Sequence, residues 1–208
     1  MSARDAILGR LGGSRPSGAI AREAAILTND PERPLVAPEA LIPQFLAQLG
    51  LASVAATFER VRDWSAVPAA AAAYLDASAL PRSLYLPPDP RLRTCDWNGF
   101  SLRETCAPDE PAAIARAVSA VAETGSLIFE TGRTAPMLPN FLTLHHLVAV
   151  EARTIVAQLE DVPAHLRDVR AHYWVTGVSG TTDIEGQYVR GAHGPRFLHV
   201  LLVEDTPD

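Results

Sequence analysis

The clearest structural signal in the chain is the stretch Leu-Thr-Leu-His-His-Leu-Val-Ala-Val, residues 142–150. It is apolar almost throughout, which is typical of a strand that a parallel sheet buries on both faces. His145 and His146 interrupt the run. Because neighbouring side chains of a strand point to opposite faces, we expect at most one of these two imidazoles to face a cleft. Residues 197–203 predict another strand.

Helical and extended patterns alternate outward from these strands. We predict helices at 40–49, 67–75, 111–117 and 154–166, and further strands at 53–58, 83–86, 118–123, 126–130 and 173–175. This alternation predicts an α/β fold in three layers, with a single mostly parallel sheet and helices on both faces. Residues 1–34 are expected to form an amino-terminal helix and a flexible arm, because glycine, serine and proline collect there. Residues 35–208 are expected to form one α/β domain.

The composition excludes several classes of function. The net charge is −6 and there is no basic cluster, which argues against nucleic-acid binding. The chain contains no lysine, so it has neither a Walker-type phosphate lysine nor a lysine for a Schiff base or a pyridoxal-phosphate linkage. No apolar run approaches the ~20 residues that span a bilayer. The amino terminus also lacks the apolar stretch of a secretory signal, and we expect a cytoplasmic protein without membrane insertion.

Two cysteines, Cys95 and Cys106, are the only thiols. An iron–sulfur cluster normally takes four thiolates, so we expect no cluster in this chain and interpret both residues as reduced structural thiols. The histidines lack the spacing of metal ligands, and no metal site is predicted.

The segment Thr-Gly-Val-Ser-Gly-Thr-Thr-Asp-Ile-Glu-Gly, residues 176–186, follows a predicted strand and precedes a possible helix start. Such a loop can present backbone N–H groups and hydroxyls to an anion, and a helix N-terminus would add a favourable field. The alternative is a tight turn in which Thr182 or Asp183 caps a helix. The candidate ligand-binding residues of this loop are Gly177, Ser179, Gly180, Thr181 and Thr182.

Carboxylates and an imidazole follow closely. Asp183 and Glu185 could form a general acid/base pair, or they could be a helix cap and a solvated acid. His193 lies in a turn beside Gly194, which permits close approach of the backbone. His199 lies within an apolar strand and is interpreted as a core histidine. Upstream, the Glu123-Thr124-Gly125 segment offers either ligand-contacting groups or a simple turn.

Three segments resemble the lactate-utilisation protein C family, the LUD-domain proteins. They are Ala122–Leu127, His146–Val150, and the run from Thr182–Gly186 through His193-Gly194-Pro195 to Leu198–Val200. The resemblance implies a fold similar to the group of ribose-phosphate isomerases, CoA-transferases and formyltetrahydrofolate cyclo-ligases. It further implies a role in the oxidation of L-lactate to pyruvate, together with separate iron–sulfur partner proteins that carry the clusters.

Three functions remain open on the sequence. The first is a subunit of a lactate-utilisation system that binds a small anionic metabolite. The second is an independent enzyme or binding module for a phosphorylated or carboxylated metabolite. The third is a purely structural or regulatory partner, in which the 176–186 loop is a stability feature. For the first two, we expect one cleft outside the carboxyl ends of the strands, where ligands gather in open α/β sheets. Its predicted catalytic residues are Glu123, Asp183, Glu185 and His193, and its predicted ligand-binding residues include Thr124, Gly125, His146 and Gly194.

Overall fold

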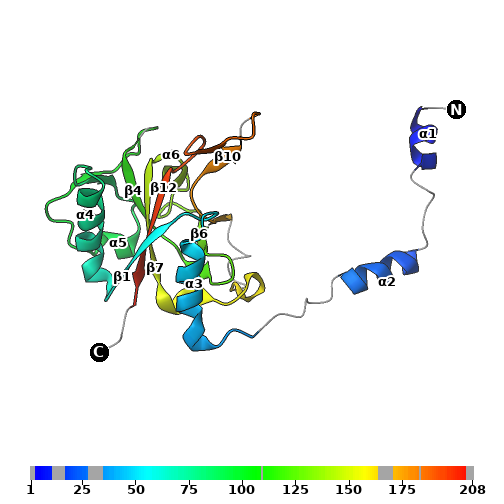
Figure 1. The fold of residues 1–208 in the computed structure, drawn as a ribbon, viewed down its shortest axis with the longest axis horizontal. Coiled ribbons are helices and arrows are strands. Elements are labelled where there is room, and N and C mark those ends of the chain that lie inside the picture. The colour runs from blue at the N-terminus through cyan, green and yellow to red at the C-terminus, as the bar shows by residue number, and fades with distance from the viewer. Residues whose placement is uncertain are drawn as a thin grey trace. The chain divides into compact units, whose positions relative to one another are not determined.

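A parallel sheet runs through the centre of the main domain in this computed structural model (Figure 1), which describes residues 3–10, 17–27, 35–108, 110–163, 171–182 and 184–204. Among these residues the sheet has six strands in the order β1-β12-β7-β4-β2-β3, all parallel. The strands are β1 (Thr57–Val61), β12 (Phe197–Val203), β7 (His145–Glu151), β4 (Ala112–Arg116), β2 (Ser83–Tyr85) and β3 (Ser101–Arg103). The predicted α/β fold with a mostly parallel sheet is confirmed.

β7 lies inside the sheet, between β12 and β4, and all of its residues are buried. Its apolar side chains alternate between two cores, with Val148 on one side and Leu147 on the other. This placement explains the apolar run of the sequence, because neither face of the strand meets water.

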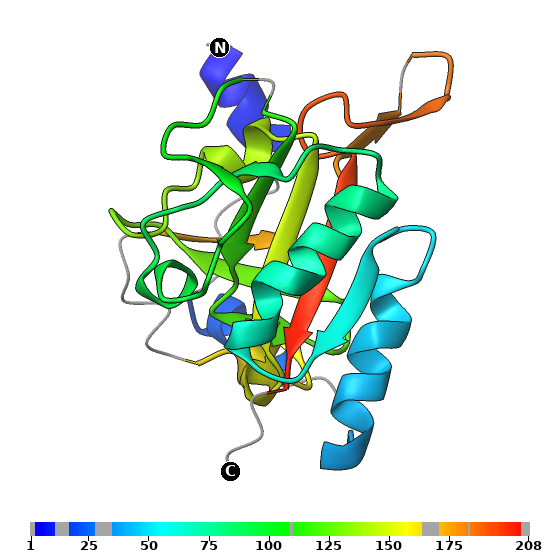
Figure 2. The same ribbon diagram turned by 90° about the vertical axis from the view of Figure 1, so that its left-hand side faces the viewer.

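Helices cover one face of the sheet. They are η2 (Trp64–Ala66), α4 (Val67–Ala77) and the short α5 (Pro90–Arg93). Figure 2 shows α4 lying across the strands of this face. The alanine-rich α4 packs closely on the sheet through Ala70, Ala71 and Leu75, which are at most 5% exposed.

The opposite face carries helix α3 (Leu41–Leu49), after the turn η1 (Pro38–Ala40), and a second, smaller sheet that the sequence did not predict. In the described residues this sheet has the order β8-β5-β6-β9. Its strands are β8 (Ile155–Val156), β5 (Ser119–Val121), β6 (Ser126–Glu130) and β9 (His172–Val175). Phe45, Leu127 and Phe129 fill the core between the two layers.

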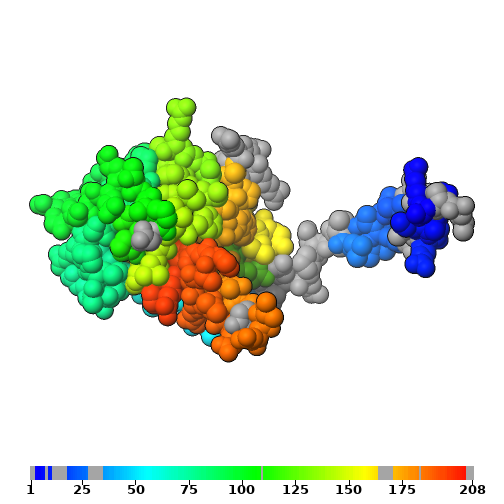
Figure 3. All heavy atoms as spheres, turned by 90° about the horizontal axis from the view of Figure 1, so that it is seen from above, coloured from blue at the N-terminus to red at the C-terminus, as the bar shows by residue number. Residues whose placement is uncertain are grey.

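A hairpin of β10 (Gly180–Thr182) and β11 (Tyr188–Arg190) stands out from the domain beside β12 (Figures 1 and 2), and it lies at the surface in orange in Figure 3. The remaining short elements are α6 (Pro139–Leu142), η3 (Ala152–Thr154) and η4 (Leu159–Asp161). In the part of the chain that the structure describes, no helix has the length and apolar character needed to cross a membrane.

Contacts divide the chain into residues 1–35 and 36–208. The first unit contains α1 (Ala3–Arg10) and α2 (Ser17–Leu27). The expectation of an arm without helix after residue 11 is wrong at 17–27. Four alanines and few helix-breaking residues give 19–27 a high helix propensity, which the flanking glycines and prolines obscured.

Three other predicted elements need correction. Residues 111–117 form strand β4 instead of a helix, because buried alanines fit between β7 and β2 despite their helix propensity. Within 154–166, Ile155 pairs with Ala120 of β5, and this pairing replaces the predicted helix; 164–170 lie outside the described residues. The strand predicted at 53–58 begins only at Thr57, since Ala55 has a positive φ of 53° in the turn after α3.

The buried Asp89 provides a test of what holds the α5 face together. Its Oδ1 caps α5 by accepting from the N–H groups of Arg91 and Leu92, at 2.9 and 3.0 Å, and its Oδ2 accepts from Arg116 Nε at 3.0 Å. We predict that Asp89→Ala lowers the free energy of unfolding by about 2–4 kcal/mol, since it removes a cap and leaves a partly buried guanidinium unpaired.

Urea unfolding measures this effect. Asp76→Ala is the matched control, because Asp76 pairs with Arg82 at a site where both side chains are 50% exposed. It should cost less than about 1 kcal/mol. Equal losses in the two variants would contradict the role assigned to Asp89.

Candidate functional site

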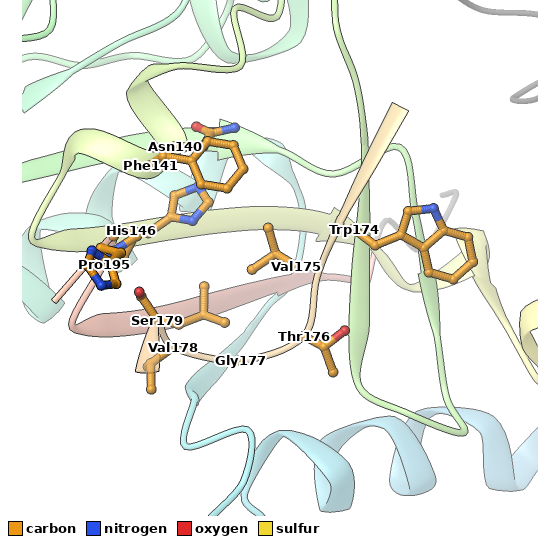
Figure 4. Close-up of a pocket in the computed structure, with 13 residues that line it drawn as sticks. Asn140, Phe141, His146, Trp174, Val175, Thr176, Gly177, Val178, Ser179 and Pro195 are labelled. Atoms are coloured by element: carbon orange, nitrogen blue, oxygen red, sulfur yellow. The ribbon is translucent and has the colours of Figure 1, made fainter. Parts of the chain in front are cut away.

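A cavity of about 310 Å³ opens at the amino-terminal ends of β7 and β12. Its walls come from the α6 turn, the start of β7, and the chain from the end of β9 to the start of β12. Figure 4 shows these segments around it. The residues that carry its chemistry are Asn140, His146, Thr176, Ser179 and His193.

His146 is the central polar group of this cavity. It is the second residue of β7, in register with Leu198 of β12, and it is only 1% exposed. Neither ring nitrogen has a hydrogen-bond partner among the described residues. Burial lowers the pKa of His146 from 6.5 to about 3, so the ring is neutral at physiological pH. A neutral imidazole has one nitrogen that donates and one that accepts.

Aromatic side chains hold the His146 ring in place. Phe129 stacks on it with ring centroids 5.8 Å apart, and Tyr173 stacks on Phe129 in turn, at 5.1 Å. The Asn140 amide donates to the Tyr173 hydroxyl at 2.5 Å. Burial raises the pKa of Tyr173 to about 12, which keeps its hydroxyl protonated. This wall is therefore closely packed and uncharged.

The wall formed by Gly177 and Ser179 is positioned by backbone hydrogen bonds. The Val178 N–H donates to Val54 O at 3.0 Å, and the Ser179 N–H donates to Pro195 O at 2.8 Å. Gly177 has a φ of 93°, and a Cβ there would lie 2.4 Å from Val54 O. Only glycine fits at this position.

The structure brings together part of the predicted site. His146, Gly177, Ser179, His193 and Gly194 all line the cavity. The predicted roles, catalytic for His193 and ligand-binding for the other four, stay predictions, but the convergence of these residues on one cavity supports that part of the site.

Other predicted residues lie elsewhere. Glu185, Gly180, Thr181 and Thr182 belong to the hairpin, and Asp183 lies outside the described residues. The predicted helix start is wrong, because strand β10 occupies 180–182. The loop therefore has no helix dipole to direct at an anion.

Glu123, Thr124 and Gly125 form the turn between β5 and β6 and do not line the cavity. Thr124 is linked to it through hydroxyls: its Oγ1 lies 2.7 Å from Ser126 Oγ, which lies 2.6 Å from Thr176 Oγ1. Thr176 lines the cavity but was not predicted. A threonine at the end of a predicted strand is too weak a sequence signal to predict that its side chain lines a cavity.

The cavity lies at the amino ends of the strands rather than the predicted carboxyl ends. At the carboxyl ends, polar groups are already paired: Glu151 accepts from Trp64 Nε1 at 3.2 Å and pairs with Arg153, and Asp89 pairs with Arg116. The expectation that at most one of the paired histidines faces a cleft is also wrong. His145 lines a different cavity on the other face of the sheet.

These features define an α/β domain with a cavity at the amino-terminal edge of its parallel sheet. Residues 111–203 match the family model of the LUD domain, and the resemblance of the sequence to the LUD-domain family is confirmed. The chain is 37% identical over 93 residues to a protein named Lactate utilization protein C from Deinococcus radiodurans. That match covers 40% of this chain and 42% of the relative, so the aligned part is about two fifths of the relative's length.

A solved structure of a DUF162 family protein from Deinococcus radiodurans has a similar fold. It aligns with a TM-score of 0.61 over 81% of this chain and 99% of that chain, at 18% identity. At this identity the likeness supports the fold and carries no residue roles.

The unpartnered imidazole of His146 should lower the free energy of unfolding of the protein. A buried polar group without a partner loses its hydrogen bonds to water and gains none. We predict that His146→Leu raises the free energy of unfolding by about 1–2 kcal/mol. His172→Leu, at an exposed histidine outside the cavity, should change it by less than about 0.5 kcal/mol. Urea unfolding at pH 7 decides between these outcomes, and a less stable His146→Leu protein would contradict the interpretation.

The burial of His146 and His199 also predicts that the folded protein loses stability in acid. Burial lowers the pKa of His146 to about 3 and that of His199 to about 4, against 6.5 for an ordinary histidine. Below pH 6.5 the unfolded chain therefore binds more protons, and stability falls as the pH is lowered. Each group contributes a slope approaching about 1.4 kcal/mol per pH unit. In His146→Leu, urea unfolding at about pH 5.5 and 4.5 should show a slope shallower by about that amount. An unchanged slope would contradict the prediction.

Proposed function

We propose that this chain acts in lactate utilisation as a subunit that binds L-lactate or pyruvate in the His146 cavity, while iron–sulfur partner proteins carry the electrons. The observation that carries the proposal is the buried, neutral imidazole of His146, which lines the cavity and whose ring nitrogens have no hydrogen-bond partner among the described residues. The name of the Deinococcus relative, Lactate utilization protein C, supports the assignment to lactate metabolism.

A neutral imidazole suits both forms of such a metabolite. It can accept a hydrogen bond from the 2-hydroxyl of lactate at its unprotonated nitrogen, and it can donate to the keto oxygen of pyruvate from the other. The alcohol and the ketone of one two-electron oxidation would therefore be bound by the same side chain, without a change in its charge.

The carboxylate would lie at the mouth of the cavity. No arginine is among the described residues that line it, and the chain contains no lysine. A carboxylate in the interior would be desolvated without a counter-charge, which is costly. His193 is exposed and Ser179 half-buried, so both can contact a carboxylate that remains partly in water. This orientation directs the reacting carbon of the ligand toward His146.

The properties of the two thiols of this chain support the proposal that the iron–sulfur clusters are on partner proteins. Two thiols cannot complete a four-thiolate cluster, and burial raises the pKa of both, that of Cys106 to about 11, which opposes the deprotonation that binding to iron requires. Removal of two electrons from lactate requires an acceptor. We propose that partner proteins supply it and that this chain carries no redox centre.

The alternative of an enzyme for a phosphorylated metabolite is less well supported. A phosphate site built on the 176–186 loop would use a helix N-terminus, and the chain forms strand β10 there instead. The carboxylated ligand of the proposal does not depend on that feature.

Titration calorimetry with L-lactate and pyruvate tests the proposal. We predict that His146→Leu weakens binding at least about tenfold, because a buried hydrogen bond to the ligand is lost. Ser179→Ala should weaken it about threefold to fivefold, since Ser179 contacts only the partly solvated carboxylate. His172→Leu is the matched control and should bind as the unaltered protein does.

Two results would overturn the assignment. One is unaltered affinity of a folded His146→Leu protein for both acids. The other is tighter binding of ribose 5-phosphate than of either acid, which would favour the phosphorylated-metabolite alternative.

A further inference from the structure

A second group of polar rings lies on the α4 face of the sheet. His145 points there from the start of β7, and the Tyr74 hydroxyl of α4 lies 2.9 Å from its Nδ1. The Tyr74 ring also stacks on His199 of β12, with centroids 4.2 Å apart. These side chains come from three elements that are distant in sequence, and they meet at the same edge of the sheet as the His146 cavity.

His199 extends this group to the edge strand β1. Its Nδ1 lies 2.8 Å from Thr57 Oγ1, whereas its buried Nε2 has no hydrogen-bond partner among the described residues. The interpretation of His199 as a satisfied core histidine is therefore only half correct. One side of the ring is bonded and the other is not.

A cavity of about 460 Å³ lies beside these groups. Thr57, Tyr74, Ser78 and His145 give it a polar side, and among the described residues that line it none is Asp, Glu or Arg. Burial lowers the pKa of both histidines and raises that of Tyr74, so every polar group here is neutral at physiological pH. A charged ligand would be desolvated here without a counter-charge in the lining, because Arg196, whose guanidinium lies 5.7 Å from the Phe197 ring centroid, does not line the cavity.

The other side of the cavity is apolar and offers an aromatic surface. Phe197 stacks on His145 with centroids 4.4 Å apart and is 42% exposed, and Leu198 and Ala55 lie beside it. A flat ring can pack against Phe197 while its polar substituent reaches the hydroxyls and the imidazole.

We propose that this cavity is a second binding site, for an uncharged planar molecule that carries a hydrogen-bonding group, such as an aromatic amide. Tyr74 and His145 bind the polar group, and Phe197 packs on the ring. Leu198 lines both cavities, yet their polar groups lie on opposite faces of the sheet and differ in the ligand they suit. The second site does not depend on the proposed role in lactate utilisation.

Benzamide and benzoate test the proposal, because they share shape and ring but differ in charge. Both are titrated at pH 7 into the full-length protein, with the ring nitrogens of its histidines followed by NMR. We expect benzamide to shift the His145 and His199 signals, and benzoate to bind at least about tenfold more weakly, since its charge must be desolvated. The His146 signal should be unaffected by benzamide.

Substitutions of Tyr74 and Phe197 test which side chains contact benzamide. Tyr74→Phe should weaken benzamide binding about fivefold to tenfold through the lost hydroxyl. Phe197→Ala should weaken it about fivefold through the lost ring contact, and it keeps the fold intact because Phe197 is partly exposed. Tyr188→Phe, at an exposed tyrosine of the hairpin, and His146→Gln are the controls and should leave benzamide binding unchanged.

The proposal is overturned if benzamide leaves the His145 and His199 signals unmoved, or if benzoate binds as tightly as benzamide. It is equally overturned if Phe197→Ala keeps full affinity. Circular dichroism confirms that each variant is folded. Should Tyr74→Phe fail to fold, the Phe197→Ala result decides.

Discussion

The burial of β7 on both faces is the constraint on which the rest of the domain depends. A strand with no exposed face has to alternate its side chains between two cores, and β12 and β4 must pair with it on either side. The same alternation forces His145 and His146 apart. One imidazole enters the aromatic core under the small sheet, and the other enters the space beneath α4. The His145-His146 dipeptide therefore places one neutral imidazole at each of the two cavities.

The connections of the sheet explain why the His146 cavity lies at its amino-terminal edge. The chain leaves the small sheet after β9, passes Val54 and Pro195, and enters β12 from that edge, so Ser179 and the turn that holds His193 are carried there. At the other edge the strands end in ion pairs and hydrogen bonds that already satisfy Glu151 and Asp89. In this domain the open edge is therefore opposite to the one usual for open α/β sheets.

The sequence predicts those elements whose pattern has one physical explanation. Continuous apolar runs identify β7 and β12, and the alanine-rich stretch at 67–75 identifies α4. The same reasoning fails for residues 112–116, which were predicted to be helical and form β4. Alanine favours a helix by its propensity, but its small size also suits a tightly packed central strand. In the site, the segment His146–Val150 predicted that His146 would lie in a cleft, and His146 lines the cavity. The places of Thr176 and Tyr173 in the cavity walls depend on tertiary hydrogen bonds and ring stacking, which local patterns do not encode.

The buried polar side chains of the domain differ in whether they have a partner. The buried carboxylates of Asp89, Glu110 and Glu151 each have a cationic or N–H partner, as stability requires. His146 and His199 are also buried, yet they keep ring nitrogens without a partner among the described residues. Both lie at the edge where the cavities open. Because a leucine at either position would fit an apolar core at lower cost, stability alone gives no reason for these imidazoles, whereas the binding that we propose for the two cavities would give one.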